Sequence, residues 1–177
     1  IEYKKKENTE DNEIILGITG SLSASINLDS SYYINNNVAL IEGALYKGDN
    51  IKSIIELGAQ ETKYITDIDR NSIKFFMNTS CASGTGSFLE EQASRLLINV
   101  EDISSYVEKA SSIPRIAGRC SVFSKTDMIH HMQDGVSVED ILQGLCYALV
   151  RNYKANVIQK NLINKPVMLT GGVMTNK

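Results

Sequence analysis

The order of the predicted strands and helices restricts the fold of this 177-residue chain more than any other feature. Three short stretches rich in β-branched and aromatic residues, at 53–57, 63–68 and 72–77, are separated by turn residues and predict an antiparallel meander. Helical patterns dominate afterwards, and an apolar run at 166–170 predicts one more strand. Mixed strands and helices in this order are typical of an α/β protein.

The longest predicted helix has one continuous apolar stripe. Ser137 followed by acidic residues at 139 and 140 is a typical helix start. Residues at helical spacing then mark the buried face: Val138, Ile141, Leu142, Leu145, Leu149, Tyr153 and Val157. Further helices are predicted at 38–46, 85–97 and 99–110, another start is predicted at Ser124, and a strand is predicted at 13–19.

Composition excludes several classes of protein. The net charge of −3 gives no electrostatic footprint for nucleic acid, and no apolar run approaches the roughly 18 residues that a membrane span needs. Three cysteines without a signal peptide favour a cytoplasmic location. Residues 1–12 mix charges of both signs and are interpreted as a tail or linker.

Predicted strands run into glycine-containing turns at three places: 17–21, 56–63 and 169–176. Glycine lets backbone N–H groups approach an anion closely, so such turns can hold phosphates. Glu56 or Glu61 in the second turn can hold Mg²⁺ through water. None of the three is a P-loop or a GxGxxG match, and each taken alone is also explained as an ordinary β-turn.

Two cysteines, Cys81 and Cys120, each directly precede a predicted helix start. The positive potential at a helix N-terminus favours a thiolate, and two thiolates can supply half of a four-cysteine metal centre or iron–sulfur cluster. The alternative is that they are small inert core residues, an interpretation that suits Cys146 within the long helix. His130 and His131 are interpreted as surface or packing residues.

Taken together, the segments at 78–88, 119–123 and 170–176 resemble the activator ATPases of 2-hydroxyacyl-CoA dehydratases and benzoyl-CoA reductases, the BadF/BadG/BcrA/BcrD family. Residues 75–78 and 119–127 are most similar to its large fused members, the CoA-substrate-specific enzyme activases. The resemblance implies the actin/hexokinase/Hsp70-like ATPase fold, in which two ribonuclease H-like lobes close on ATP.

By this resemblance, residues 13–50 finish the first lobe and residues 51–177 form the second, so the ATPase fold is incomplete in this chain. The resemblance also implies a homodimer in which both subunits supply thiolates to one shared [4Fe–4S] cluster. It implies three sets of site residues: Glu56 and Gln60 as catalytic groups; Gly58, Ala59, Gly84, Gly86, Thr170, Gly171 and Gly172 at ATP with Mg²⁺; and Cys81 and Cys120 as cluster ligands.

The activity implied is ATP-driven transfer of a low-potential electron to an acyl-CoA dehydratase or reductase. Two departures from the family pattern stand out. The first phosphate motif has no counterpart in residues 1–20, and the usual Asp-x-Gly-Gly becomes 56–59, Glu-Leu-Gly-Ala. Two alternatives therefore remain: a non-catalytic activase-like interaction domain of a larger fused protein, and a small-molecule kinase of the same fold.

Overall fold

The chain divides into two compact units, Ile1–Asp49 and Asn50–Lys177, which are described separately. The computed structural model describes residues 16–20, 23–25, 31–48, 50–68, 72–78 and 84–175. Cys81 and Asn176 therefore lie outside the described residues. In the described part, no helix combines the length and apolar character that crossing a bilayer requires.

The first unit contains a short parallel strand pair and one helix. Strand β1 (Leu16–Ile18) pairs with β2 (Ser31–Tyr33), and a 3₁₀ turn (Ser23–Ser25) lies between them in the chain. Helix α1 (Asn36–Lys47) begins where the Asn35 side chain accepts a hydrogen bond of 2.9 Å from the Asn37 backbone N–H. The described part of the first predicted strand and the helix at 38–46 are confirmed, whereas β2 was not predicted.

The second unit is built on a four-stranded sheet in the order β5-β4-β3-β6. Strands β3 (Ser53–Leu57), β4 (Thr62–Thr66) and β5 (Lys74–Met77) form the predicted antiparallel meander. The last strand, β6 (Val167–Thr170), runs parallel to β3, with Glu56 opposite Thr170. Because the two strands point the same way, the glycine turns that follow them come out at the same edge of the sheet.

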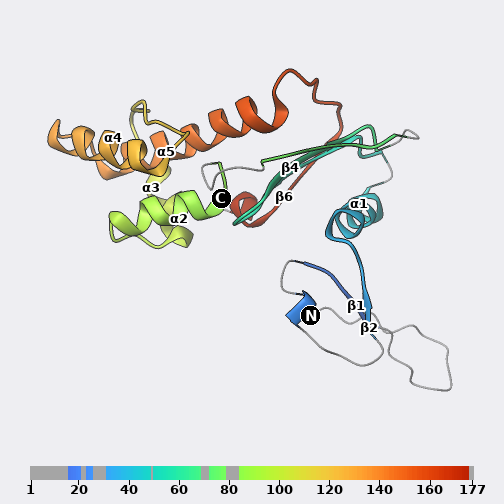
Figure 1. The fold of residues 1–177 in the computed structure, drawn as a ribbon. Coiled ribbons are helices and arrows are strands. Elements are labelled where there is room, and N and C mark those ends of the chain that lie inside the picture. The colour runs from blue at the N-terminus through green and yellow to red at the C-terminus, as the bar shows by residue number, and fades with distance from the viewer. Residues whose placement is uncertain are drawn as a thin grey trace. The chain divides into compact units, whose positions relative to one another are not determined.

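The helices of this unit pack into one core with the sheet. They are α2 (Gly86–Arg95), α3 (Ile103–Val107), α4 (Ser121–Gln133) and α5 (Val138–Tyr153), and α5 continues into a π-helical turn (Lys154–Ile158). Figure 1 shows α4 and α5 side by side, in agreement with their contacts. The core contains the predicted stripe of α5, including Leu145 and Leu149, with Phe88 of α2 and Tyr64 of β4. The predicted buried face of the long helix is thus confirmed.

Two helix boundaries differ from the sequence prediction. Ser124 does not start a helix: α4 begins at Ser121, and the Ser124 hydroxyl instead donates to the Cys120 carbonyl at 3.0 Å and to the Ala117 carbonyl. The predicted helix at 99–110 is a 3₁₀ turn (Val100–Asp102) followed by the short α3, and the Asn99 side chain makes no capping bond there. In both places the sequence pattern predicted that a serine or asparagine side chain caps a helix. Neither side chain makes that capping bond in the structure.

An extended segment, residues 111–118, links α3 to α4 and is held at its start by Asp140 of α5. The Asp140 carboxylate accepts hydrogen bonds from the backbone N–H groups of Ser111 at 2.6 Å and Ser112 at 2.8 Å, and from the Ser112 hydroxyl at 3.0 Å. Asp140 is only 7% exposed. These bonds, led by the one from the Ser112 backbone, lower the pKa of Asp140 from its usual 3.8 to about 2.

A carboxylate with a lowered pKa stabilises the folded state above its unfolded pKa, and this contribution is lost as pH falls toward the folded pKa. We therefore expect the wild-type free energy of unfolding to fall between about pH 4 and pH 2, in part because Asp140 becomes protonated. Asp140→Asn should be less stable at pH 7 and should lose less stability over that window. Denaturant titrations at several pH values measure both effects. Asp134→Asn, at an exposed position, is the control; an equal change in both variants would contradict this role of Asp140.

Candidate nucleotide site and the Cys120 helix start

The turn after β6 packs directly on the end of β3. Gly171 has a positive φ of 99°, and a Cβ there would lie less than 3.0 Å from the carbonyl oxygen of Leu57. Only glycine fits this position, for conformational and for steric reasons. The neighbouring hairpin turn is equally tight, because the Gly58 N–H donates to the Glu61 carbonyl at 2.9 Å.

The start of α2 docks on the same hairpin turn. The backbone N–H groups of Gly86 and Ser87 donate to the carbonyls of Gly58 and Ala59, both at 2.8 Å. A Cβ on Gly86 would lie 3.0 Å from the Val173 side chain and 3.1 Å from the Ala59 Cα. Three chain segments that are far apart in the sequence thus meet through backbone groups, and these two N–H groups of α2 are already used within the protein.

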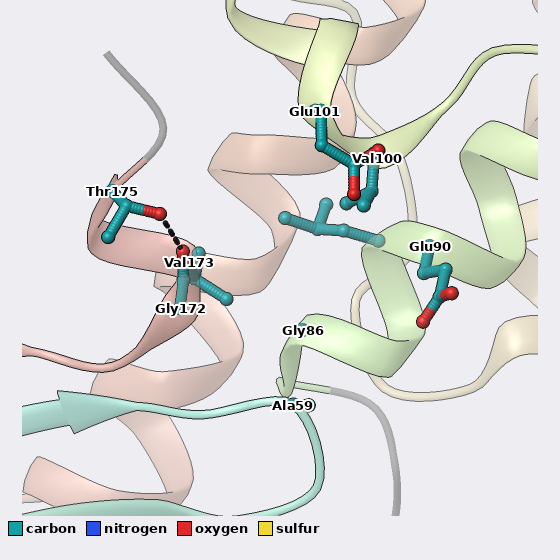
Figure 2. A pocket seen from close by; sticks show the side chains of 9 residues that line it. Ala59, Gly86, Glu90, Val100, Glu101, Gly172, Val173 and Thr175 are labelled. Atoms are coloured by element: carbon teal, nitrogen blue, oxygen red, sulfur yellow. Dashed lines mark hydrogen bonds between the residues drawn. The ribbon is translucent and has the colours of Figure 1, made fainter. Parts of the chain in front are cut away.

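A pocket of about 390 Å³ lies where the three segments meet. Figure 2 shows its wall formed by Ala59 of the hairpin turn, by Gly86 and Glu90 of α2, and by the turn after β6. In that turn the Thr175 hydroxyl donates to the Gly172 carbonyl at 2.7 Å. The complete lining is Ala59, Gly86, Leu89, Glu90, Val100, Glu101, Gly172, Val173 and Thr175. The pocket therefore combines glycine-rich backbone with two carboxylates.

The predicted nucleotide residues fall into three groups in the structure. Ala59, Gly86 and Gly172 line the pocket. Gly58, Thr170 and Gly171 belong to the strand end and turns directly behind that wall. Gly84 instead faces the side chain of Asn152: a Cβ on this glycine would lie 3.1 Å from Asn152 Oδ1.

Sequence reasoning missed the acidic part of the pocket, Glu90 and Glu101. Glu90 lies four residues after Gly86 on α2, so helical spacing places both on one face. That signal was present in the sequence. The position of Glu101 depends on the 3₁₀ turn that replaces the predicted helix, and no local pattern indicated it.

The two predicted catalytic residues have different surroundings. Gln60 is exposed at the tip of the β3–β4 hairpin. Glu56 faces the buried ammonium group of Lys63, whose Nζ lies 3.4 Å from Glu56 Oε2 and 2.9 Å from Glu61 Oε2. The Glu56 contact has the distance of an ion pair without the geometry of a hydrogen bond, and Glu56 Oε2 is buried with no hydrogen-bond partner. This oxygen thus retains capacity to accept a further hydrogen bond.

Cys120 is the N-cap residue of α4, as the sequence predicted. Its thiol is half-buried and makes no capping hydrogen bond, and the following Val122 and Phe123 are 67% and 65% exposed. Thr85 is the N-cap of α2. Cys81 lies outside the described residues, so the expectation that it directly precedes a helix stays a prediction. Cys146 packs against the core, and burial raises the pKa of its thiol to about 11, which supports the interpretation of this residue as a packing residue.

Helix α2 links the pocket to the region of Cys120. Glu91 follows the pocket residue Glu90 and pairs with Arg95, one turn later, at 2.6 Å. The same carboxylate interacts with the side chain of Ser121, directly after Cys120. The Arg95 hydrogen bond is the main cause that lowers the pKa of Glu91, and the Ser121 side chain adds to it. Among the described residues, no three His, Cys, Asp or Glu side chains gather as a metal site.

Solved structures identify the class of fold. The chain resembles the activator of 2-hydroxyisocaproyl-CoA dehydratase from Clostridium difficile, solved with bound ADPNP, with a TM-score of 0.81 and 24% identity over 90% of this chain and 59% of that one. It also resembles component A of (R)-2-hydroxyglutaryl-CoA dehydratase from Acidaminococcus fermentans, with a TM-score of 0.77 and 27% identity over 90% and 61% of the two chains. The predicted α/β fold of the actin/hexokinase/Hsp70-like ATPases is confirmed.

The chain belongs to the BadF/BadG/BcrA/BcrD ATPase family, whose model matches residues 6–177. Among its relatives, the activator of lactoyl-CoA dehydratase from Anaerotignum propionicum is 32% identical over 76% of this chain and 52% of its own length. The activating ATPase of (R)-2-hydroxyglutaryl-CoA dehydratase from Acidaminococcus fermentans is 31% identical over 76% and 51%. The chain thus spans about half the length of the curated relatives it matches.

Two adjacent glycines allow a matched test of the contact between the turn after β6 and the end of β3. In Gly171→Ala, the positive φ and the clash with the Leu57 carbonyl should lower the free energy of unfolding by about 2–4 kcal/mol. Gly172→Ala is the control, because a Cβ there meets nothing within 4 Å, and it should change stability by only a few tenths of a kcal/mol. Denaturant unfolding measures both. Equal stability of the two variants would contradict the described packing.

Proposed function

We propose that the pocket binds ATP and that the intact protein is an ATP-dependent activator. In this proposal it passes a low-potential electron to an acyl-CoA dehydratase or reductase. The observation that carries the proposal is the meeting of three glycine-containing segments around one pocket, in a fold shared with a dehydratase activator solved with bound ADPNP. The names of the relatives support the class of partner enzyme.

The chemistry of the pocket wall suggests an orientation for the nucleotide. Glycine-rich backbone at Ala59 and Gly172 suits phosphate groups, because N–H dipoles can approach the anion closely. Glu90 and Glu101 repel phosphate but accept hydrogen bonds from ribose hydroxyls or from the adenine amino group. We infer that phosphates lie toward the turns and the nucleoside toward the two carboxylates.

Neither Gln60 nor Glu56 lines the pocket, but both flank the turn that carries Ala59, where we place the phosphates. Gln60 is exposed, so its amide is able to orient a water molecule against a phosphate. The free capacity of Glu56 Oε2 fits a water molecule of a hydrated Mg²⁺, which keeps several waters when bound to protein. The nearby Lys63 ammonium limits the negative charge that Glu56 offers to such an ion.

The surroundings of Cys120 fit a ligand of an iron–sulfur cluster. Cys120 has a half-buried thiol that makes no capping bond at the N-terminus of a 13-residue helix, so its sulfur is available as a ligand. With Cys81 each chain supplies two ligands, so a two-fold dimer completes four. The exposed Val122 and Phe123 beside Cys120 are apolar surface that a second copy would cover. A bound [4Fe–4S] cluster supplies one-electron chemistry at low potential.

The path from the pocket to Cys120 supports coupling between nucleotide and thiolates. One helix, α2, carries Gly86 and Glu90 at the pocket and Glu91 at Ser121. A displacement of α2 on nucleotide binding would therefore reach the residue next to Cys120. We propose that the change between nucleotide states alters the surroundings of the cysteines by this route.

The test of the cluster uses the intact parent protein, purified without oxygen. We expect iron and acid-labile sulfide, and visible and EPR spectra typical of a [4Fe–4S] cluster. Cys81→Ser and Cys120→Ser should each abolish the signal, because the ligand set is then incomplete. Cys146→Ser is the matched control and should keep it, since that thiol lies in α5 and stays protonated. No signal in the wild type, or an unchanged one in both ligand variants, would contradict the proposal.

A second candidate is a non-catalytic activase-like domain of a larger fused protein, which keeps the pocket without hydrolysis. The pairing of Glu56 with Lys63 and the methyl group of Ala59 in the turn favour it. ATP turnover by the intact parent protein separates the two candidates. If the protein hydrolyses ATP, Gln60→Ala should remove turnover, because Gln60 is a proposed catalytic residue. The variant should keep its stability, because the side chain is exposed.

A further inference from the structure

Asn152 is a buried polar residue at the C-terminal end of α5, outside the nucleotide pocket. It is 5% exposed, and a buried amide needs hydrogen-bond partners. Its Nδ2 donates to the Gly118 carbonyl, and its Oδ1 accepts from Asn156 Nδ2 at 2.5 Å. The helix changes from α to π directly after this point, at Lys154–Ile158, and such changes are frequent at functional sites.

The two neighbours of Asn152 belong to the two cysteine-bearing segments. Gly118 precedes Cys120 by two positions, and Gly84 follows Cys81 by three positions in the sequence. Gly84 has a positive φ of 100°, and a Cβ there would lie 3.1 Å from Asn152 Oδ1. The Asn152 side chain therefore lies against both segments. Its amide nitrogen faces Gly118, and its amide oxygen faces Gly84.

The segment before Cys120 is fixed to α5 by more than this one bond. Arg151 Nη2 donates to the Ile116 carbonyl at 2.9 Å, and a Cβ on Gly118 would meet the Ala148 carbonyl at less than 3.0 Å. From the other side, Asp127 of α4 accepts from the Ala117 N–H at 2.8 Å. The backbone that leads into Cys120 is thus held between α4 and α5, and Asn152 of α5 also lies beside Gly84.

We propose that Asn152 is a positioning residue for Cys120: its buried amide sets the spacing between Gly84, just before α2, and Gly118, and so the position from which the Cys120 thiol binds a cluster. This inference rests on the proposed role of Cys81 and Cys120. Asn156 supports it from the next helical turn by fixing the orientation of the Asn152 amide. Rigid support of this kind is what precise ligand sites require.

The test compares three variants of the intact parent protein. Asn152→Asp keeps the shape of the side chain but replaces the donor to Gly118 with an acceptor. Asn156→Ala removes the hydrogen bond that supports the Asn152 amide. Because Asn156 is exposed, this variant should fold even if Asn152→Asp does not. Asn161→Asp is the matched control, because it breaks a similar amide bond, to the Ile158 carbonyl, away from both cysteine segments.

The first measurement is amide hydrogen exchange in the metal-free protein. We expect exchange to rise roughly three- to tenfold in Asn152→Asp, both at 84–87 and at 116–120, in keeping with the loss of one buried hydrogen bond. Asn156→Ala should give a smaller rise at the same two places. Wild-type exchange at either segment, or an equal rise in Asn161→Asp, would overturn the proposal. Since no cluster is involved, this result stands whether or not the cysteines bind one.

The second measurement is the EPR spectrum and midpoint potential of the cluster-bearing protein. We expect both to change in Asn152→Asp and to stay at the wild-type values in Asn161→Asp, because the potential responds to ligand geometry and nearby hydrogen bonds. A residue needed only for folding would lower stability without moving either quantity. Wild-type spectra and potential in Asn152→Asp would overturn the proposal. Absence of a cluster from the wild type itself would instead contradict the proposed function.

Discussion

The contact between two backbone turns at one edge of the sheet supports the rest of the second unit. Strands β3 and β6 run parallel and end side by side, and the turn after β6 approaches the Leu57 carbonyl so closely that only glycine fits at position 171. The start of α2 then donates two N–H groups to the hairpin turn that follows β3. The pocket is the space that remains between these segments, and these backbone contacts fix the positions of Ala59, Gly86 and Gly172 in its wall.

The buried ammonium group of Lys63 is paired with two carboxylates in the second unit. Lys63 is 2% exposed and lies between Glu56 and Glu61 at the base of the β3–β4 hairpin. A buried ammonium without a counter-charge would cost several kcal/mol, so the two carboxylates are first of all needed for folding. The proposed role of Glu56 at a hydrated Mg²⁺ has to coexist with this pairing. A longer glutamate in place of the family's usual aspartate places the carboxylate one methylene further from the backbone of the strand.

Much of this architecture was predictable because strong local patterns agreed with the tertiary structure. The meander, the last strand and the buried stripe of α5 follow from alternation, turn residues and helical spacing, and each was confirmed. The glycine turns were recognised, but only strand order brings those at Gly58 and Gly171 together, and pairing of distant strands is not encoded in a local pattern. Ser124 misled the prediction because its hydroxyl bonds to carbonyls of the preceding turn instead of capping a helix. The amide of Asn152 gave no sequence signal, since its partners lie far away along the chain.

The most direct test of the proposed nucleotide pocket is the pattern of hydrogen-exchange protection that ATP with Mg²⁺ gives to the full-length protein. We expect protection at 58–61, 86–91 and 171–175 together, because one ligand would contact all three segments. Protection should weaken in parallel at all three as the nucleotide concentration is lowered. Protection of only one segment, or protection confined to parts of the protein outside this pocket, would contradict the proposed binding of ATP there.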